Sequence, residues 1–143
     1  MDTKTAMFGM KKVLLARLPN GEDLLSALES IVSSASIGVG VFSIIGAVSC
    51  ATFGYYDQKQ KQYRTLKRAG KYEVLSCFGS LSLKEGKLMA HAHIIFGDEQ
   101  GATFGGHLMS PTTIFAAELY LHELEGEQLI RQYDEKTGLY LWT

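Results

Sequence analysis

Residues 90–108 read AHAHIIFGDEQGATFGGHL, and this stretch contains three of the four histidines of the chain. The alternating side chains of its first half are typical of a β-strand, and GDEQGA predicts a hairpin turn. Gly101 suits the left-handed position that closes a three-residue loop, 99–101. In that hairpin Asp98 pairs with Ala102, which fixes the register of both strands.

This register brings the three histidines to one face of the hairpin. His93 lies directly opposite His107, and His91, two residues before His93, lies on the diagonal. Opposite Cβ atoms are about 5 Å apart and diagonal ones about 7 Å apart. A loop that is one residue shorter or longer would place His107 on the other face. Gly105 and Gly106 predict either a bulge or open space beside His107 for a metal or ligand.

Three imidazoles at these distances can reach a common zinc ion at about 2.0–2.1 Å. The alternative is three ordinary polar residues on a solvated strand face. We predict a metal site, with zinc as the cofactor, formed by His91, His93 and His107. Imidazole also binds copper, iron and nickel, so the sequence does not fix the metal. Three protein ligands leave one tetrahedral position open, which is typical of catalytic zinc.

Catalysis would also require an acid–base group close to the metal. The candidates are Glu118, which interrupts the apolar run IFAAELYL, and Glu73 in KYEVLS. Each equally fits the exposed face of an alternating strand. His122, in ELYLHEL, is interpreted as a surface residue outside the site.

The rest of the chain predicts one helix and several strands. Leucines, Ile31 and Val32 at helical spacing predict a helix over 22–34. Apolar, β-branched and aromatic runs predict strands at 11–18, 39–56 (one strand, or two broken at Gly46), 71–83, 87–97, 102–108 and 113–124, and a strand pair within 129–142. We expect an α+β (α/β two-layer) fold in which a helix packs on a mostly antiparallel sheet. It forms a single compact domain over residues 1–143, with its core at about 11–142.

Composition limits the function further. The 143 residues are 46% hydrophobic and carry a net charge of −1, which excludes disorder and any general attraction to nucleic acid. Cys50 and Cys77 form no CxxC pair, so we expect a reducing, cytoplasmic location. Residues 31–56 are uncharged, but serines and glycines interrupt them, so we expect no membrane span.

Residues 57–71, DQKQKQYRTLKRAGK, are polar and are interpreted as a loop or a short exposed helix. Their cations can contact phosphates, and Tyr63 can stack on a base. A solvated connection is the alternative, and no helix-turn-helix, zinc-finger or RNP-like motif is present. The weak nucleic-acid candidates are Lys59, Lys61, Arg64, Lys67, Arg68 and Lys71.

Five motifs together resemble the plants-and-prokaryotes-conserved (PPC) domain family. They are LPNGEDLLSAL, GVFSIIGAVSCATFGYYD, YEVLSCFGSLSL, HAHIIFGDEQGATFGGHL and RQYDEKTGLYLW, between Leu18 and Trp142. The resemblance implies a homotrimer and, in plants, an association with AT-hook DNA-binding motifs. This chain has no AT-hook and is similar to the stand-alone prokaryotic type. The PPC fold also resembles acetolactate decarboxylase, where a similar H-x-H…H arrangement binds zinc; this likeness does not carry the decarboxylase activity over.

Three functions therefore compete. The first is a DNA-associated binding and assembly module that acts through a partner or through the basic segment. The second is a zinc-dependent enzyme acting on a small carbonyl or ester compound. The third is a small-ligand sensor whose metal recognises an anion. An enzyme predicts a carboxylate within reach of the metal in an enclosed pocket, whereas a sensor predicts such a pocket without the acid.

Overall fold

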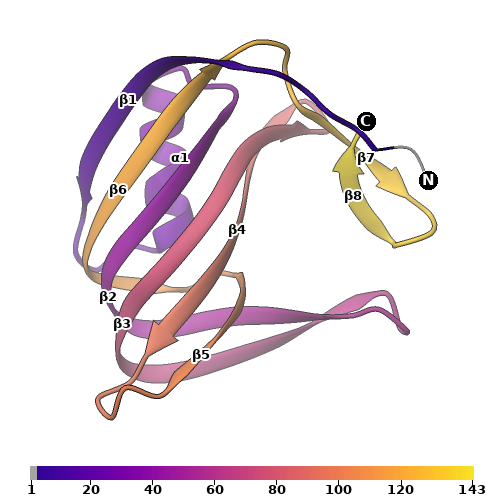
Figure 1. The fold of residues 1–143 in the computed structure, drawn as a ribbon. Coiled ribbons are helices and arrows are strands. Elements are labelled where there is room, and N and C mark those ends of the chain that lie inside the picture. The colour runs from indigo at the N-terminus through magenta and orange to yellow at the C-terminus, as the bar shows by residue number, and fades with distance from the viewer. Residues whose placement is uncertain (1–2) are drawn as a thin grey trace.

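The computed structural model describes residues 3–143 and contains eight strands and one helix (Figure 1). In chain order these elements are β1 (Gly9–Leu18), α1 (Leu24–Ser34), β2 (Gly40–Asp57), β3 (Gln62–Lys84), β4 (Lys87–Gly97), β5 (Thr103–Leu108), β6 (Thr113–Glu125), β7 (Ile130–Asp134) and β8 (Leu139–Trp142). They form one sheet in the order β1-β6-β2-β5-β4-β3-β7-β8. Every pairing is antiparallel except the short one between β3 and β7.

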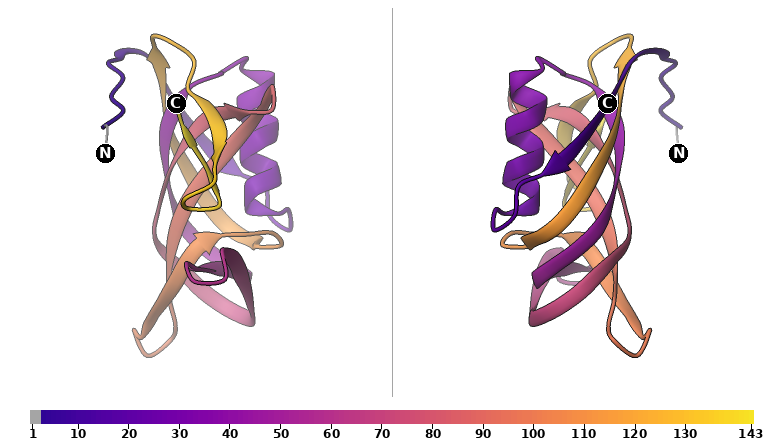
Figure 2. Two further views of the ribbon diagram at one scale, coloured as in Figure 1. Left: turned by 90° about the vertical axis from the view of Figure 1, so that its right-hand side faces the viewer. Right: turned by 90° about the vertical axis from the view of Figure 1, so that its left-hand side faces the viewer.

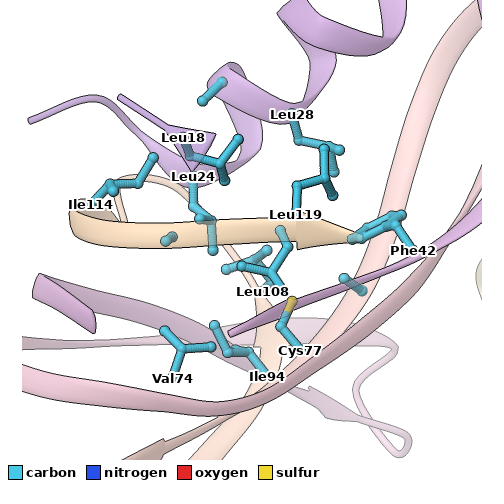
Figure 3. Close-up of a cluster of buried hydrophobic side chains, with 14 of the residues drawn as sticks. Leu18, Leu24, Leu28, Phe42, Val74, Cys77, Ile94, Leu108, Ile114 and Leu119 are labelled. Carbon is cyan, nitrogen blue, oxygen red and sulfur yellow. The ribbon is translucent and has the colours of Figure 1, made fainter. Parts of the chain in front are cut away.

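The helix begins where Asp23 caps it, because the Asp23 carboxylate accepts a hydrogen bond from the Ser26 N–H at 3.1 Å. Its apolar stripe lies on one face of the sheet (Figure 2). Figure 3 shows Leu24 and Leu28 pointing from α1 toward Leu119 of β6. This cluster is fully buried and forms the core of the molecule. The helix is 11 residues long, and no helix of the described chain is long and apolar enough to cross a bilayer.

The predicted α+β two-layer fold is wrong, because strands dominate and the sheet closes on itself. β2 pairs with β3 and β6 along its first part, and its Phe53 and Gly54 also pair with β5. Since β5 pairs with β4, and β4 with β3, these four strands form a closed ring. Two bulges in β2, near Gly46 and before Cys50, bend this 18-residue strand. The bend allows the first part of β2 to pair with β6 and the later part to pair with β5.

The interpretation of residues 57–71 as a loop or short helix is also wrong. They continue β2 and β3 into a long two-stranded hairpin whose ladder ends at the Asp57–Gln62 pair. We call residues 50–69 the hairpin arm. Cross-strand contacts hold it: the Tyr56 and Tyr63 rings lie 4.9 Å apart, and Arg64 forms an ion pair with Asp57.

The arm and the C-terminal hairpin β7–β8 project from the same side of the sheet (Figure 1). Two hydrogen bonds join them: the Tyr56 hydroxyl donates to the Thr137 carbonyl, and the Lys61 ammonium donates to the Glu135 carbonyl, each at 2.7 Å. Residues of the arm, of the C-terminal hairpin and of the histidine hairpin line one cavity.

Candidate metal centre

The histidine hairpin, β4–β5, has the predicted register. The Asp98 N–H donates to the Ala102 carbonyl at 2.9 Å, and the Gly101 N–H donates to the Asp98 carbonyl at 3.0 Å. Gly101 has φ = +80°, the left-handed conformation that the three-residue loop requires. His93 therefore pairs directly with His107, as predicted.

Gly105 and Gly106 form no bulge, because the β4–β5 ladder continues without a register shift through both. Each glycine instead permits a close backbone approach. A Cβ atom on Gly105 would overlap the carbonyl oxygen of Ile94 in β4, and one on Gly106 would overlap that of Gly54 in β2. The two glycines thus hold β5 between its neighbours and fix the position of His107.

The three imidazoles converge as the register predicts. One nitrogen from each of His91, His93 and His107 lies within 4.8 Å of the other two. The ring centroids are 5.0 Å apart for His91 and His107, 5.3 Å for His91 and His93, and 5.7 Å for His93 and His107. Nitrogens bound to one zinc at about 2.0–2.1 Å lie at most about 4.2 Å apart, so side-chain shifts of about 1 Å complete the site.

The electrostatics keep two of these imidazoles, those of His91 and His107, in the neutral form that binds a metal. Burial, followed by the charges of Arg131 and His93, lowers the pKa of His91 to about 4. Burial, followed by the charges of His91, His93 and Arg131, lowers the pKa of His107 to about 4. Both rings are therefore neutral at pH 7. The Nδ1 atom of His107 is buried and has no hydrogen-bond partner among residues 3–143, so a metal ion would satisfy it.

These pKa values predict the acid stability of the metal-free protein. The unfolded chain binds more protons at His91 and His107 than the folded chain does, because their pKa falls from 6.5 to about 4 on folding. The free energy of unfolding should therefore fall as the pH drops from 6.5 toward 4. After allowance for partial exposure, we expect the two together to contribute about 1–3 kcal/mol. Urea unfolding at stepped pH measures this change.

The matched control is the double variant His91→Gln, His107→Gln. It should lose only this part of the pH dependence, while carboxylates elsewhere continue to titrate. An unchanged slope between pH 6.5 and 4.5 in the double variant would contradict the assignment.

The histidines border a cavity of about 250 Å³ that sequence analysis did not reveal. His91 and His107 form part of its wall, and the Tyr63 ring of the arm lies 4.7 Å from the His107 ring. The Arg131 side chain from β7 also lines the cavity, next to His91. No local pattern marks Arg131, because its burial depends on the C-terminal hairpin closing over a sheet built from distant residues.

The two candidate carboxylates do not line this cavity. Glu118 is exposed on β6 and accepts a hydrogen bond from the Tyr120 hydroxyl at 2.6 Å. Glu73 pairs with Gly97 at the far end of β4 and borders a different hollow. His122 is half-buried on β6, so the surface interpretation holds only in part; it lies outside the histidine cluster.

The six basic residues of segment 57–71 do not form one continuous face. Arg64 is paired with Asp57, and the Arg68 guanidinium lies 4.1 Å from the centroid of the Phe104 ring. Lys67 lies between Arg68 and Leu66 on the same strand and therefore points to the opposite face from Arg68. Lys59 and Lys61 lie in the turn at the tip of the arm, and Lys71 lies near its base.

Comparison with known proteins places this geometry in a family. The profile of the Plants and Prokaryotes Conserved (PCC) domain matches residues 6–125. A metal-containing protein from Archaeoglobus fulgidus is 38% identical, with a TM-score of 0.94 and 99% of each chain covered. A plant- and prokaryote-conserved (PPC) protein from Pyrococcus horikoshii is 36% identical, with a TM-score of 0.92 over 99% of this chain and 97% of that one.

The chain is also similar to a further solved structure and to part of a longer protein. A Ralstonia eutropha protein proposed to bind DNA is 29% identical, with a TM-score of 0.79 over 90% of this chain and 89% of that one. The bifunctional protein GlmU of Synechococcus sp. (strain JA-3-3Ab) is 34% identical over 132 residues, which are 91% of this chain. This chain spans only 20% of the length of that relative.

Proposed function

This chain belongs to the Plants and Prokaryotes Conserved (PCC) domain family, and from that premise we propose that it is a metal-dependent ligand-binding and assembly protein. In this proposal His91, His93 and His107 hold one divalent ion, and zinc is the ion we expect. The observation that carries the proposal is the convergence of one imidazole nitrogen from each of the three histidines within 4.8 Å; His107 also has a buried Nδ1 atom without a partner among residues 3–143. The metal content of the Archaeoglobus relative supports it.

We place ligand binding ahead of catalysis. A zinc ion with three protein ligands keeps a position at which it attracts an oxygen donor of a bound molecule. The cavity beside the histidines has no Asp or Glu in its described wall, so it offers no carboxylate as a general base. The zinc-dependent enzyme acting on a carbonyl or ester compound is therefore the weaker alternative.

A zinc titration tests the proposed centre. Tag-free, metal-depleted protein competes for zinc with a chromophoric chelator, and we expect one high-affinity site per chain. His93→Ala should weaken binding at least about 100-fold, since one of three ligands is lost. His122→Ala, which removes a histidine outside the cluster, should bind like the wild type. Equal affinity in His93→Ala and the wild type would refute the site.

We also propose that the chain assembles as a homotrimer in the cytoplasm. Ile45, Phe78 and Ile95 each follow a buried core residue by one position, so they lie on the sheet face opposite the helix. All three are exposed, and Phe78 pairs with His93. An exposed apolar cluster of this kind is typical of an association surface. Both cysteines are free thiols, which agrees with a reducing compartment.

Phe78→Asp should therefore dissociate the assembly, because it places a charge in an apolar contact. Sedimentation equilibrium should give three times the chain mass for the wild type and a lower mass for the variant. Met7→Asp, in the exposed segment before β1, is the control outside the sheet. A monomeric wild type, or a Phe78→Asp variant of unchanged mass, would contradict the proposed surface.

DNA association is the second candidate function. Two observations favour it: the Ralstonia relative is proposed to bind DNA, and Lys67 and Arg68 are exposed on the arm. If the chain binds DNA directly, its affinity for DNA should fall steeply between 50 and 200 mM salt. The reason is that each phosphate contact releases about one counterion from the DNA. It also requires loss of affinity in the double variant Lys67→Ala, Arg68→Ala. Gel-shift titration of duplex DNA at both salt concentrations decides this.

A further inference from the structure

The cavity beside the histidines is bounded by parts of the chain that are distant in sequence. His91 and His107 come from β4 and β5, Tyr63 from the arm, and Arg131 and Tyr140 from the C-terminal hairpin. Residues of the arm and of that hairpin, which project from the same side of the sheet in Figure 1, both line the cavity. Its volume of about 250 Å³ suits a molecule of a few non-hydrogen atoms.

Arg131 is the unusual group in this cavity, because its guanidinium is buried without a carboxylate. The residue is 8% exposed, and no Asp or Glu oxygen among residues 3–143 lies within 4.0 Å of it. Its Nε donates to the Ser82 hydroxyl at 2.8 Å, and its Nη1 donates to the Tyr140 carbonyl at 3.0 Å. A buried charge without a counter-ion is strongly unfavourable. An anion bound from solution would neutralise this charge, since no carboxylate of the described chain does so.

The remaining donors of Arg131 are available to that anion. A guanidinium has five N–H donors, and the contacts to Ser82 and Tyr140 use two. Its Nη2 lies 3.5 Å from His91 Nδ1, which is long for a hydrogen bond. Even if that contact takes a third donor, two remain. Two donors on one planar group match the two oxygens of a carboxylate.

The rest of the wall is cationic, aromatic, apolar or uncharged and polar, and it contains no carboxylate from residues 3–143. Lys61 and Lys84 also line the cavity, but the Lys61 ammonium donates to the Glu135 carbonyl and the Lys84 ammonium lies over the Tyr140 ring at 3.8 Å. Met89 and Leu141 add apolar surface. The wall thus attracts negative charge and also accepts a small hydrocarbon group.

We propose that this cavity binds a small free carboxylate, which pairs with Arg131 while its apolar part lies against the aromatic and aliphatic wall. The inference deepens the proposed function, because the carboxylate binds next to the metal-ligating histidines. The carboxylate site itself does not require the metal centre. A bound metal ion would only increase the affinity of the cavity for the carboxylate. Arg131 and the cavity wall are present in either case.

Calorimetric titration with butyrate and with butyramide tests the proposal. Butyramide has nearly the same shape but no charge. We expect butyrate to bind metal-depleted wild-type protein at least about tenfold more tightly than butyramide, since charged hydrogen bonds contribute most of the difference. Arg131→Met should remove this preference. Arg131→Lys, which keeps the charge but loses the planar donors, should weaken butyrate binding by a smaller factor. Arg17→Met, on β1, is the arginine control and should bind butyrate normally.

The outcomes separate this inference from the metal centre. If zinc binds but butyrate and butyramide bind equally or not at all, the carboxylate proposal is overturned and the metal centre stands. The proposal is overturned in the same way if a carboxylate of a second copy already occupies Arg131, because butyrate then cannot enter. If butyrate binds through Arg131 but no zinc binds, the carboxylate site stands without the metal. Should Arg131→Met fail to fold, the butyramide and Arg131→Lys comparisons still decide the question.

Discussion

Gly106→Ala should destabilise the protein by about 3–5 kcal/mol and remove metal binding at the same time. A Cβ atom at this position would overlap the Gly54 carbonyl, so β5 must move away from β2. That pairing consists of Phe53 with Leu108 and Gly54 with His107. Its loss opens the ring of strands and displaces His107. Urea unfolding and zinc titration of the same sample measure both effects.

The matched control is Gly101→Ala in the same hairpin. A Cβ atom on Gly101 meets nothing within 4 Å, so only its left-handed φ of +80° is unfavourable. We expect a cost of about 1 kcal/mol and unchanged zinc affinity. If the two variants lose similar stability, the close approach of Gly106 in β5 to Gly54 in β2 does not position His107.

Zinc should stabilise the folded protein strongly. A ligand that binds only the folded state adds about 4 kcal/mol when its free concentration is 1,000 times its dissociation constant. The three ligands come from β4 and β5, so the ion joins both strands of the hairpin. We expect the unfolding transition of the metal-depleted protein to rise when zinc is added, as measured by thermal or urea denaturation.

This stabilisation should be absent in His91→Ala, His93→Ala and His107→Ala. It should persist in His122→Ala, because His122 lies on β6 outside the cluster. A zinc-induced rise of equal size in all four variants would show that zinc binds elsewhere on the chain.

The histidine hairpin could be predicted because its determinants are local. Gly101 adopts the left-handed turn, and the Asp98 carboxylate accepts from the Gln100 and Ala102 N–H groups. Once the loop length is fixed, strand alternation places His93 and His107 on one face. No contact with the rest of the protein is needed for this prediction.

The first strand of the arm is predicted as part of the strand 39–56, but its turn and second strand could not be predicted from hydrophobic patterning. Residues 58–69 are exposed on both faces, so apolar and polar residues there do not alternate as they do in a half-buried strand. What holds it extended is a set of cross-strand pairs, including the Tyr56–Tyr63 contact and the Arg64–Asp57 ion pair. This missed hairpin led to the wrong fold class, because the strands that continue into it are the ones that close the sheet.

Arg131 was missed for a similar reason. An arginine at the start of a short strand is expected to be exposed. Its burial depends on Ser82, 49 positions earlier, and on the arm that closes over the cavity. Glu118, by contrast, interrupts an apolar run only because β6 alternates between its buried and exposed faces.

The measurement that tests the central claim most directly is the metal content of the protein as purified, without a histidine tag, beside the His93→Ala variant. Elemental analysis should find close to one zinc per chain in the wild type and almost none in the variant. No metal in either protein, or equal metal in both, would contradict a three-histidine metal centre.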